Sequence, residues 1–514
     1  MMVAAGIFSS RIVGFVRGAA VAHFLGAGAA ADAWQAAFRI PNFLQNLFGE
    51  GALSASFIPV YSSLLGQGRE KEARTVAGGV AALLGLLVAA LVLLGVLATP
   101  WLISLIAPGF EGERRELAIR LVRIVFPGTG LLVLSAWCLG VLNSHGRFYL
   151  AYASPVAWNV AIIAALLLAG SDRSGSAIVV IAAWGAVAGS ALQLLIQLPA
   201  VLPLVRGMPL RPSVADAGVR TVLSRFGPAF VTRGVTQIGG YVDTIIASFL
   251  PLGMLANLGY AQLLSYLPIS LFGIAVSAAE LPAMSRTAGD AGELTDEART
   301  QLQTRLARGL RQLAYFVVPS AVAFLALGHV LAGVLFQSGR FTARDSLIVW
   351  TILGGAAVGL LAATMGRLFS SAFYALRDTR TPLRYAGIRV ACNVALGWFA
   401  ALYLPRLLGL SPEWGGAGLT AAAGIAAWLE FAMLRRGLAG RIGAVGVPVS
   451  LLLRLWLAAL VAAGAGWAVL TWAPVPGPRP VGILVLLTYG AAYLLFTRVL
   501  GVEEARTLAG RFRR

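Results

Sequence analysis

Long apolar segments recur along the whole chain, and they decide what it can fold into. A helix needs about 20 predominantly apolar residues to cross the hydrocarbon core of a bilayer. The composition, 59% hydrophobic and only 12% charged, is not that of a soluble globular domain. The sequence therefore predicts an all-α polytopic membrane protein with about 14 transmembrane helices. We expect the spans at 3–26, 29–64, 75–107, 117–142, 150–170, 176–204, 222–250, 254–284, 306–336, 346–375, 383–404, 416–434, 449–473 and 481–500.

Basic residues are distributed unevenly over the loops between these segments. If the N-terminus is cytoplasmic, the cytoplasmic segments hold 22 arginines and lysines. Cytoplasmic loops of membrane proteins are enriched in Lys and Arg, so both termini are expected in the cytoplasm. The net charge of +19 thus orients the chain in a membrane and does not indicate nucleic-acid binding. The opposite side holds seven: Arg114, Arg115, Arg173, Arg340, Arg344, Arg406 and Arg479.

Two weak self-matches indicate an internal repeat. LFGEGALSASFIPVYSS at 47–63 resembles LFGIAVSAAELPAMS at 271–285, and the stretch 142–159, from Leu to Asn, resembles 376–393. The offsets agree, at 271 − 47 = 224 and 376 − 142 = 234 residues. Six expected spans separate the copies, so both copies keep the same orientation, as in transporters built from parallel repeats with the substrate between them.

The repeat predicts a division of the chain into lobes. We expect an N-lobe at 1–205 with helices one to six and a C-lobe at 206–440 with helices seven to twelve. Two extra helices follow at 441–500, and a basic cytoplasmic tail at 501–514. This is the architecture of two six-helix lobes with a C-terminal appendix.

Charged residues interrupt the first two apolar segments. A charged side chain in a membrane-spanning helix costs on the order of 2.5–3.5 kcal/mol on insertion scales, so such residues usually face a partner or a water-filled cavity. Near helix ends they can instead extend to the membrane surface. We interpret them as the lining of a cationic, water-accessible cavity. They are Arg11, Arg17, Asp32, Arg39 and Glu50, and the Pro41-Asn42 pair among them can break a helix.

No enzyme signature occurs in the sequence. There is no Walker A loop, no GxSxG and no HExxH, and His23, His145 and His329 are far apart. Cys138 and Cys392 show neither a disulfide framework nor a metal-ligand spacing. We therefore expect a transporter that is not an enzyme. Without a nucleotide site, an ion gradient or the membrane potential is its expected energy source.

Two aspartates outside the first segments admit more than one role. Asp243 lies deep in the apolar segment QIGGYVDTIIASF, and an intramembrane carboxylate is by default a cation or proton site. A structural ion pair with Arg233 is the alternative. Asp378 lies in the loop RDTRTP between Arg377 and Arg380, where a helix-capping or loop-bracing role suits it.

The sequence contains five motifs that bear on its family: RIVGFVR, DAWQAAFRIPN, GEGALSASFIPVY, GVLNSHGRF with the following SP and WN, and RLFSSAFYALRDTRTP. Taken together, they resemble the MurJ (MviN) family of lipid II flippases, in the multidrug/oligosaccharidyl-lipid/polysaccharide (MOP) transporter superfamily. The resemblance covers roughly residues 5–440. It implies a fourteen-helix protein of the bacterial inner membrane that moves the lipid-linked peptidoglycan precursor by alternating access, with cavity arginines binding its pyrophosphate.

The resemblance also implies site residues and partners. Asp243 and Asn393 match positions of a sodium site found in part of the family, and no other cofactor is expected. The expected partners are the lipid-linked cell-wall precursor and membrane lipid, and the protein is expected to act as a monomer associated with the cell-wall synthesis machinery. The residues expected to bind substrate are Arg11, Arg17, Asp32, Arg39 and Glu50.

The chain departs from the family pattern at several positions. Gln45 and Asn46 stand where the family often has arginines, Leu263 replaces the usual second-lobe arginine, and Gly397 replaces a sodium-site acid. A flippase for another polyprenyl-linked glycan therefore stays an alternative. A cation-coupled multidrug exporter predicts an acidic cavity, which the arginines of the first segment oppose. A membrane scaffold without transport activity is the fourth alternative.

The topology can be tested with reporter fusions. A reporter fused after Arg514 is expected to read cytoplasmic and one inserted at Gly477 external, because Gly477 lies between the last two apolar segments. Reporter activity in cells, with the membrane level of each fusion checked by immunoblot, measures both. Reversal at either point would contradict the span count and the six-span spacing of the repeat.

Overall fold

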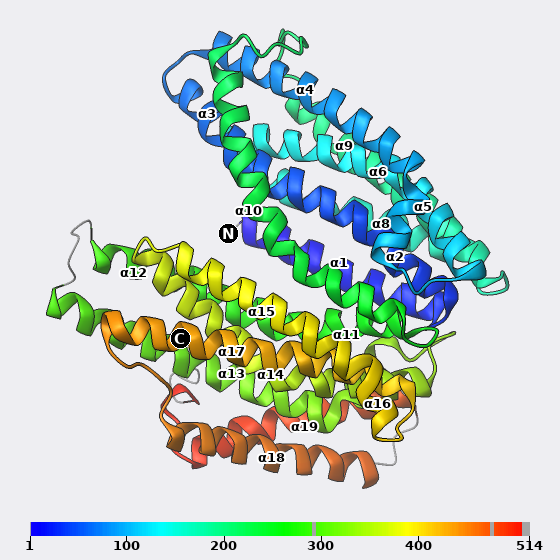
Figure 1. Cartoon of the computed structure of the whole chain (residues 1–514), viewed down its shortest axis with the longest axis vertical. Coiled ribbons are helices and arrows are strands. Elements are labelled where there is room, and N and C mark those ends of the chain that lie inside the picture. The colour runs from blue at the N-terminus through cyan, green and yellow to red at the C-terminus, as the bar shows by residue number, and fades with distance from the viewer. Residues whose placement is uncertain (1, 290–294, 473–476, 506–514) are drawn as a thin grey trace. The chain divides into compact units, whose positions relative to one another are not determined.

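The computed structural model describes residues 2–289, 295–472 and 477–505, apart from the side chains of 2–5, 7, 49, 50, 229 and 231–238 (Figure 1). The described chain is all-α; its one β feature is an isolated bridge between Ser338 and Phe341. It divides into two compact units. Unit 1 comprises Met1–Ala256 and Ser338–Phe341, and unit 2 comprises Asn257–Gln337 and Thr342–Arg514.

The helices of unit 1 are α1 (Met2–Leu25), α2 (Ala29–Leu44), η1 (Gln45–Leu53), α3 (Ser54–Gly66), α4 (Glu70–Leu97), α5 (Thr99–Ile106), α6 (Gly112–Ser144), α7 (Phe148–Ala153), α8 (Pro155–Ala169), α9 (Gly175–Val201) and α10 (Ala217–Ser248). α10 packs against η1, α3 and α4, which is why this unit extends past residue 205. The predicted lobe boundary stays a prediction, because compactness alone does not test where the repeat divides.

The helices of unit 2 are α11 (Met254–Pro268, starting in unit 1), η2 (Ile269–Ile274), α12 (Ala275–Ala288), α13 (Asp296–Phe336), α14 (Ala343–Ala375), α15 (Arg380–Trp398), η3 (Phe399–Tyr403), α16 (Leu404–Leu407), η4 (Pro412–Trp414), α17 (Gly415–Ile442), α18 (Val449–Trp472) and α19 (Pro478–Val499). Figure 1 shows α18 and α19 running side by side at the C-terminal edge of this unit. Tyr489 and Tyr493 of α19 donate hydrogen bonds to the carbonyls of Pro319 and Tyr315 in α13. These bonds fix the appendix helices to α13.

Eleven helical segments of the described chain are long and apolar enough to span a membrane. They coincide with the third to sixth and the eighth to fourteenth expected spans. α1, the continuous run α2–η1–α3, and α10 correspond to the first, second and seventh, but they fall outside the eleven. The polytopic all-α architecture is confirmed, whereas the count of fourteen is not.

Two details of the helices differ from expectation. Pro41 lies buried inside α2 and does not end it, because the helical path continues into η1. The expected span 75–107 is instead two helices, α4 and α5, that meet at Ala98. Pro100 occupies the first turn of α5, where its missing N–H has no intrahelical partner to lose.

π-helical turns occur at matching places in the two copies of the repeat. η1 precedes α3 and η2 precedes α12, in the two self-similar stretches that begin LFG. The second self-match also has a structural counterpart, because its two equivalent asparagines, Asn159 in α8 and Asn393 in α15, are both buried. π turns are rare and often lie at functional sites. The sequence did not predict them, but their placement agrees with the repeat.

Close packing in unit 2 depends on glycines where α14 meets α17. A Cβ atom added to Gly359 would lie 2.2 Å from the Cα of Gly424, closer than real Cβ contacts allow. Small residues let membrane helices approach closely and gain van der Waals contact, which drives association in lipid. The α14–α17 contact therefore requires glycine at this crossing.

Replacing Gly359 by valine is expected to lower the stability of unit 2 by about 1–3 kcal/mol, because overpacking forces the two backbones apart. The apparent melting temperature of the purified protein in detergent measures this. Gly464→Val in α18 is the matched control, since no atom lies within 4 Å of a Cβ added at Gly464. Equal melting temperatures for the two variants would contradict the packing argument.

Candidate functional site

Two arginines of α1 form the cationic part of the candidate site. Arg11 is exposed and Arg17 is half-buried. The Arg17 guanidinium lies over the ring of Trp158 in α8, 4.8 Å from the ring centroid. Within the described residues, no carboxylate forms an ion pair with either arginine. Stacking on an aromatic ring holds a guanidinium in place while its N–H edges stay available for an anion.

Asp32, in the first turn of α2, is fully buried and holds three segments together. Its Oδ2 lies 3.0 Å from Nη2 of Arg114, at the start of α6. The backbone N–H groups of Gly253 and Ala256, at the start of α11, donate to its two oxygens at 2.8 Å. A carboxylate is favoured at a helix N-terminus because unpaired N–H groups and the helix dipole meet there.

This geometry gives Asp32 a structural task. The sequence analysis expected it to line a water-filled cavity, but the side chain has no exposed surface and its oxygens are taken up by the protein. Sequence reasoning missed Arg114, which it placed in an external loop. Arg114 also stacks on the ring of Phe110 at 3.7 Å. The predicted contact between Asp32 and substrate stays a prediction.

Arg39 and Asp243 interact with each other across α2 and α10. Arg39 is half-buried, and Asp243 acts on it electrostatically. Tyr241, two residues before Asp243, donates its hydroxyl to the backbone carbonyl of Arg39 at 2.8 Å. Asp243 thus has Arg39 as an oppositely charged neighbour, while its predicted ion pair with Arg233 is not tested. The side chain of Arg233 lies outside the described residues.

The remaining predicted site residues are placed less fully. Glu50 belongs to the π-helix η1, and its side chain lies outside the described residues. Asn393 is buried in α15 of unit 2, whereas Asp243 belongs to unit 1. Among the described side chains, no group of three or more His, Cys, Asp or Glu could hold a metal ion. The sodium site at Asp243 and Asn393 stays a prediction.

Asp378 has the loop-bracing role that its position suggested. It accepts hydrogen bonds from the backbone N–H and the hydroxyl of Thr381, at 2.9 and 2.6 Å, and pairs with Arg441 at 2.5 Å. Burial alone raises the pKa of Asp378, but the hydrogen bonds from Thr381 and Arg441 outweigh it and hold the pKa at about 2. The carboxylate is therefore ionised at any physiological pH, and its bonds are occupied within the loop.

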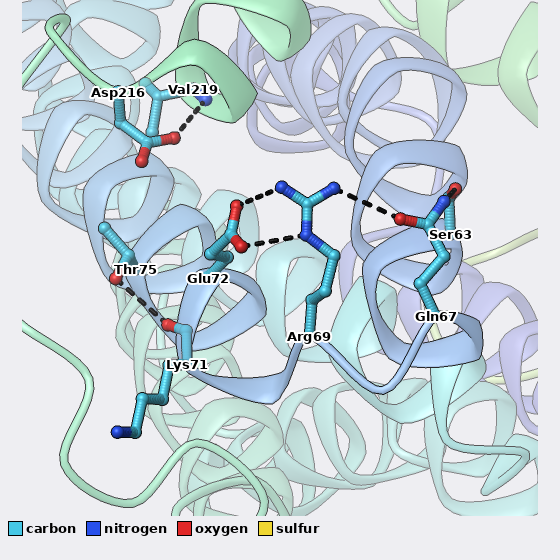
Figure 2. A network of polar contacts seen from close by, with 8 residues as sticks. All are labelled: Ser63, Gln67, Arg69, Lys71, Glu72, Thr75, Asp216 and Val219. Carbon is cyan, nitrogen blue, oxygen red and sulfur yellow. Dashed lines mark hydrogen bonds and ion pairs between the residues drawn. The ribbon is translucent and has the colours of Figure 1, made fainter.

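The basic loop between α3 and α4 is similarly self-contained. Figure 2 shows the Arg69 guanidinium between Glu72 and Gln67, with its Nε 2.8 Å from Glu72 and its Nη1 3.2 Å from Gln67. Arg74 pairs with Glu70 at 2.9 Å. Exposed pairs such as these contribute little to stability. The loop's arginines are thus neutralised locally, which leaves the α1 pair as the better candidate for binding an anion.

The fold is that of solved membrane transporters. A solved structure of a lipid II flippase MurJ in an inward closed conformation aligns with a TM-score of 0.77 and 25% identity, over 97% of this chain and 98% of that one. An inward-facing multidrug resistance MATE transporter aligns with a TM-score of 0.66 over 84% of this chain and 95% of that one. At 18% identity, the second likeness shows the fold alone.

Sequence comparison identifies the family. The profile of the family described as "Lipid II flippase MurJ" matches residues 21–476. The probable lipid II flippase MurJ of Haemophilus influenzae is 32% identical over 445 residues, 84% of each chain. That of Rhizobium meliloti is 32% identical over 477 residues, 91% of this chain and 85% of its own length. The chain belongs to the MurJ family, and the resemblance inferred from its motifs is confirmed.

The structural role of Asp32 predicts a large loss of stability on mutation. Asp32→Ala is expected to cost about 3–5 kcal/mol, because it leaves Arg114 charged and unpaired in a mostly buried place. Adding Arg114→Ala is expected to cost less than the sum of the two single changes. Thermal melts of the single and double variants in detergent measure this coupling.

The exposed pair Arg344–Glu413 supplies the matched control, since its removal is expected to change stability by about 1 kcal/mol or less. If Asp32→Ala instead melts like wild type but fails to transport, Asp32 is a substrate ligand after all.

Proposed function

We propose that this protein is a lipid flippase. It moves lipid II, the undecaprenyl-pyrophosphate-linked peptidoglycan precursor, from the inner to the outer leaflet of the bacterial cytoplasmic membrane by alternating access. Membership of the MurJ family and the eleven apolar helices support this function. Both termini lie in the cytoplasm in this proposal, and the protein itself performs no covalent chemistry.

One observation supports binding of an anionic substrate. α1 presents two arginines that no described carboxylate neutralises. Charges without a partner are expensive in a membrane, so a pair that persists there is expected to meet an anion. Lipid II carries its charge in a pyrophosphate with several oxygens, which guanidinium forks can bind bidentately. A multidrug cation would be repelled by the same groups.

The spacing of the two arginines suits an anion held from two sides. Residues six apart on a helix lie about 240° apart, at 100° per residue. Arg11 and Arg17 therefore bracket a wide face and do not stack on one stripe. Trp158 fixes the plane of Arg17, while Arg11 is exposed. The arrangement can bind a pyrophosphate at the exposed Arg11, and the better-held Arg17 can then bind further oxygens of the same group.

The energy source is a separate part of the proposal. Asp243 has the cation Arg39 as its electrostatic neighbour, which disfavours a second cation beside it. We derive no step through sodium. The membrane potential suits the proposal better, because the net charge of a pyrophosphate lipid changes leaflet with each transport cycle.

Arg11→Ala and Arg17→Ala are each expected to abolish flipping at normal expression. A charge-assisted hydrogen bond contributes roughly 1.5–3 kcal/mol, so losing one contact weakens lipid binding about tenfold or more. Arg17→Lys is expected to retain part of the activity, since it keeps the charge but not the fork. The measurement is lipid II exposed on the outer leaflet of cells that depend on the variant.

Leu263→Arg serves as the companion variant, and it is expected to be tolerated because it restores the family's usual second-lobe charge. Membrane levels of every variant are compared by immunoblot. If both alanine variants reach the membrane normally and transport lipid II at the wild-type rate, the proposal is wrong. Accumulation of a different polyprenyl-linked glycan on depletion of the protein would identify that glycan as the substrate.

A further inference from the structure

A second pair of unpaired arginines lies on the outward face of α6, apart from the residues discussed so far. Arg120 and Arg123 are both exposed, on a helix that is long and apolar enough to span a membrane. Glu116, one turn earlier, is exposed as well. Within the described residues, none of these three side chains makes an ion pair or a hydrogen bond. Spacings of three and four residues place them on one face of the helix.

These side chains line a groove between α6 and α9 with a volume of about 480 Å³. Trp184 of α9 forms its far wall and is 58% exposed. Ile119 and Ile124 supply its apolar part. Pro127 lies one turn further along α6 and has no N–H to donate to the carbonyl of Arg123.

The groove lies toward the N-terminal end of α6, from where long side chains can extend to the headgroup region of a bilayer. α6 has 33 residues and is about 50 Å long at 1.5 Å per residue, whereas the hydrocarbon core is only about 30 Å thick. Arg120 and Arg123 lie about 12 and 16 Å from the start of α6, and Trp184 lies about 14 Å from the start of α9. Tryptophan is enriched at this interfacial depth, which agrees with the placement of the arginines.

We propose that this groove binds the headgroup of a membrane phospholipid that carries both a phosphate and a primary ammonium. Arg120 and Arg123 contact the phosphate from two sides. Glu116 accepts hydrogen bonds from the ammonium. The Trp184 ring packs beside the glycerol region, and Ile119 and Ile124 contact the first methylenes of an acyl chain.

Charge complementarity selects this lipid class over its relatives. A purely anionic headgroup satisfies the arginines but places a negative charge near Glu116. A choline headgroup offers a cation that cannot donate a hydrogen bond to Glu116. Only a headgroup with a phosphate and an ammonium matches all three charged side chains. The groove is built from unit 1 alone and does not depend on the proposed flippase activity.

Native mass spectrometry of the full-length protein in detergent tests the site. The probes are phosphatidylethanolamine, phosphatidylglycerol and phosphatidylcholine with identical acyl chains. Wild type is expected to retain phosphatidylethanolamine best. Arg120→Ala together with Arg123→Ala is expected to weaken that binding at least about tenfold, as the loss of charge-assisted contacts implies. Arg406→Ala, another exposed arginine on the expected external side, is expected to change nothing.

Glu116→Gln tests binding of the ammonium separately from binding of the phosphate. It also provides a second variant should the double alanine change prevent folding. It is expected to keep phosphate binding while the preference for phosphatidylethanolamine over phosphatidylglycerol falls or reverses. Equal retention of the three lipids by wild type, or unchanged retention in both the arginine and Glu116 variants, would overturn the proposal. Flipping activity is measured in parallel, so failure of this site is distinguishable from failure of the proposed function.

Discussion

The buried carboxylate of Asp32 is the interaction on which the first unit depends most. It joins the first turn of α2, the start of α6 and the start of α11 through one ion pair and two backbone hydrogen bonds. In an apolar surrounding such a group is stabilising only when all its partners are present, because each orphaned charge carries a full desolvation penalty. The arrangement therefore fixes three helix ends in one geometry. Gly253 shows how closely they meet, since an added Cβ would lie 2.1 Å from the carbonyl oxygen of Ala27.

Charged residues in the membrane-spanning part of unit 1 fall into two groups by their partners. Asp32 with Arg114 and Arg39 with Asp243 have oppositely charged neighbours within the protein. Among the described side chains, no carboxylate pairs with the arginines of α1. This separation matters because the cost of a charge in a membrane is the same in both groups, while only the first group recovers it within the fold. The unpaired residues are thus the ones whose cost requires a ligand, solvent or lipid outside the fold.

The sequence was sufficient to predict the helical architecture and the family. It was insufficient to predict which charged side chains pair with one another. Apolar length alone places most spans, because the bilayer imposes it. Asp378 was also interpretable, since Thr381, one of its partners, lies three residues away. The partners of Asp32 and Asp243 were not, because Arg114 and Arg39 are distant in sequence and no local spacing brings them together. The π turns η1 and η2 were missed for a different reason. They add one residue to a helical turn without altering the apolar pattern around them.

Tryptophan accompanies both sets of unpaired arginines, and its exposure differs in a way that bears on their tasks. Trp158 lies under the half-buried Arg17, where an aromatic face limits the motion of the guanidinium and keeps its donors oriented. Trp184 is largely exposed beside Arg120 and Arg123, at a depth where indole rings commonly lie against lipid headgroups. The first environment restricts one cation for a ligand that must bind and leave. The second leaves two cations exposed on an open surface, which suits a lipid that exchanges with the bilayer. One residue type thus supports two kinds of anion contact, and the burial of its aromatic neighbour decides which.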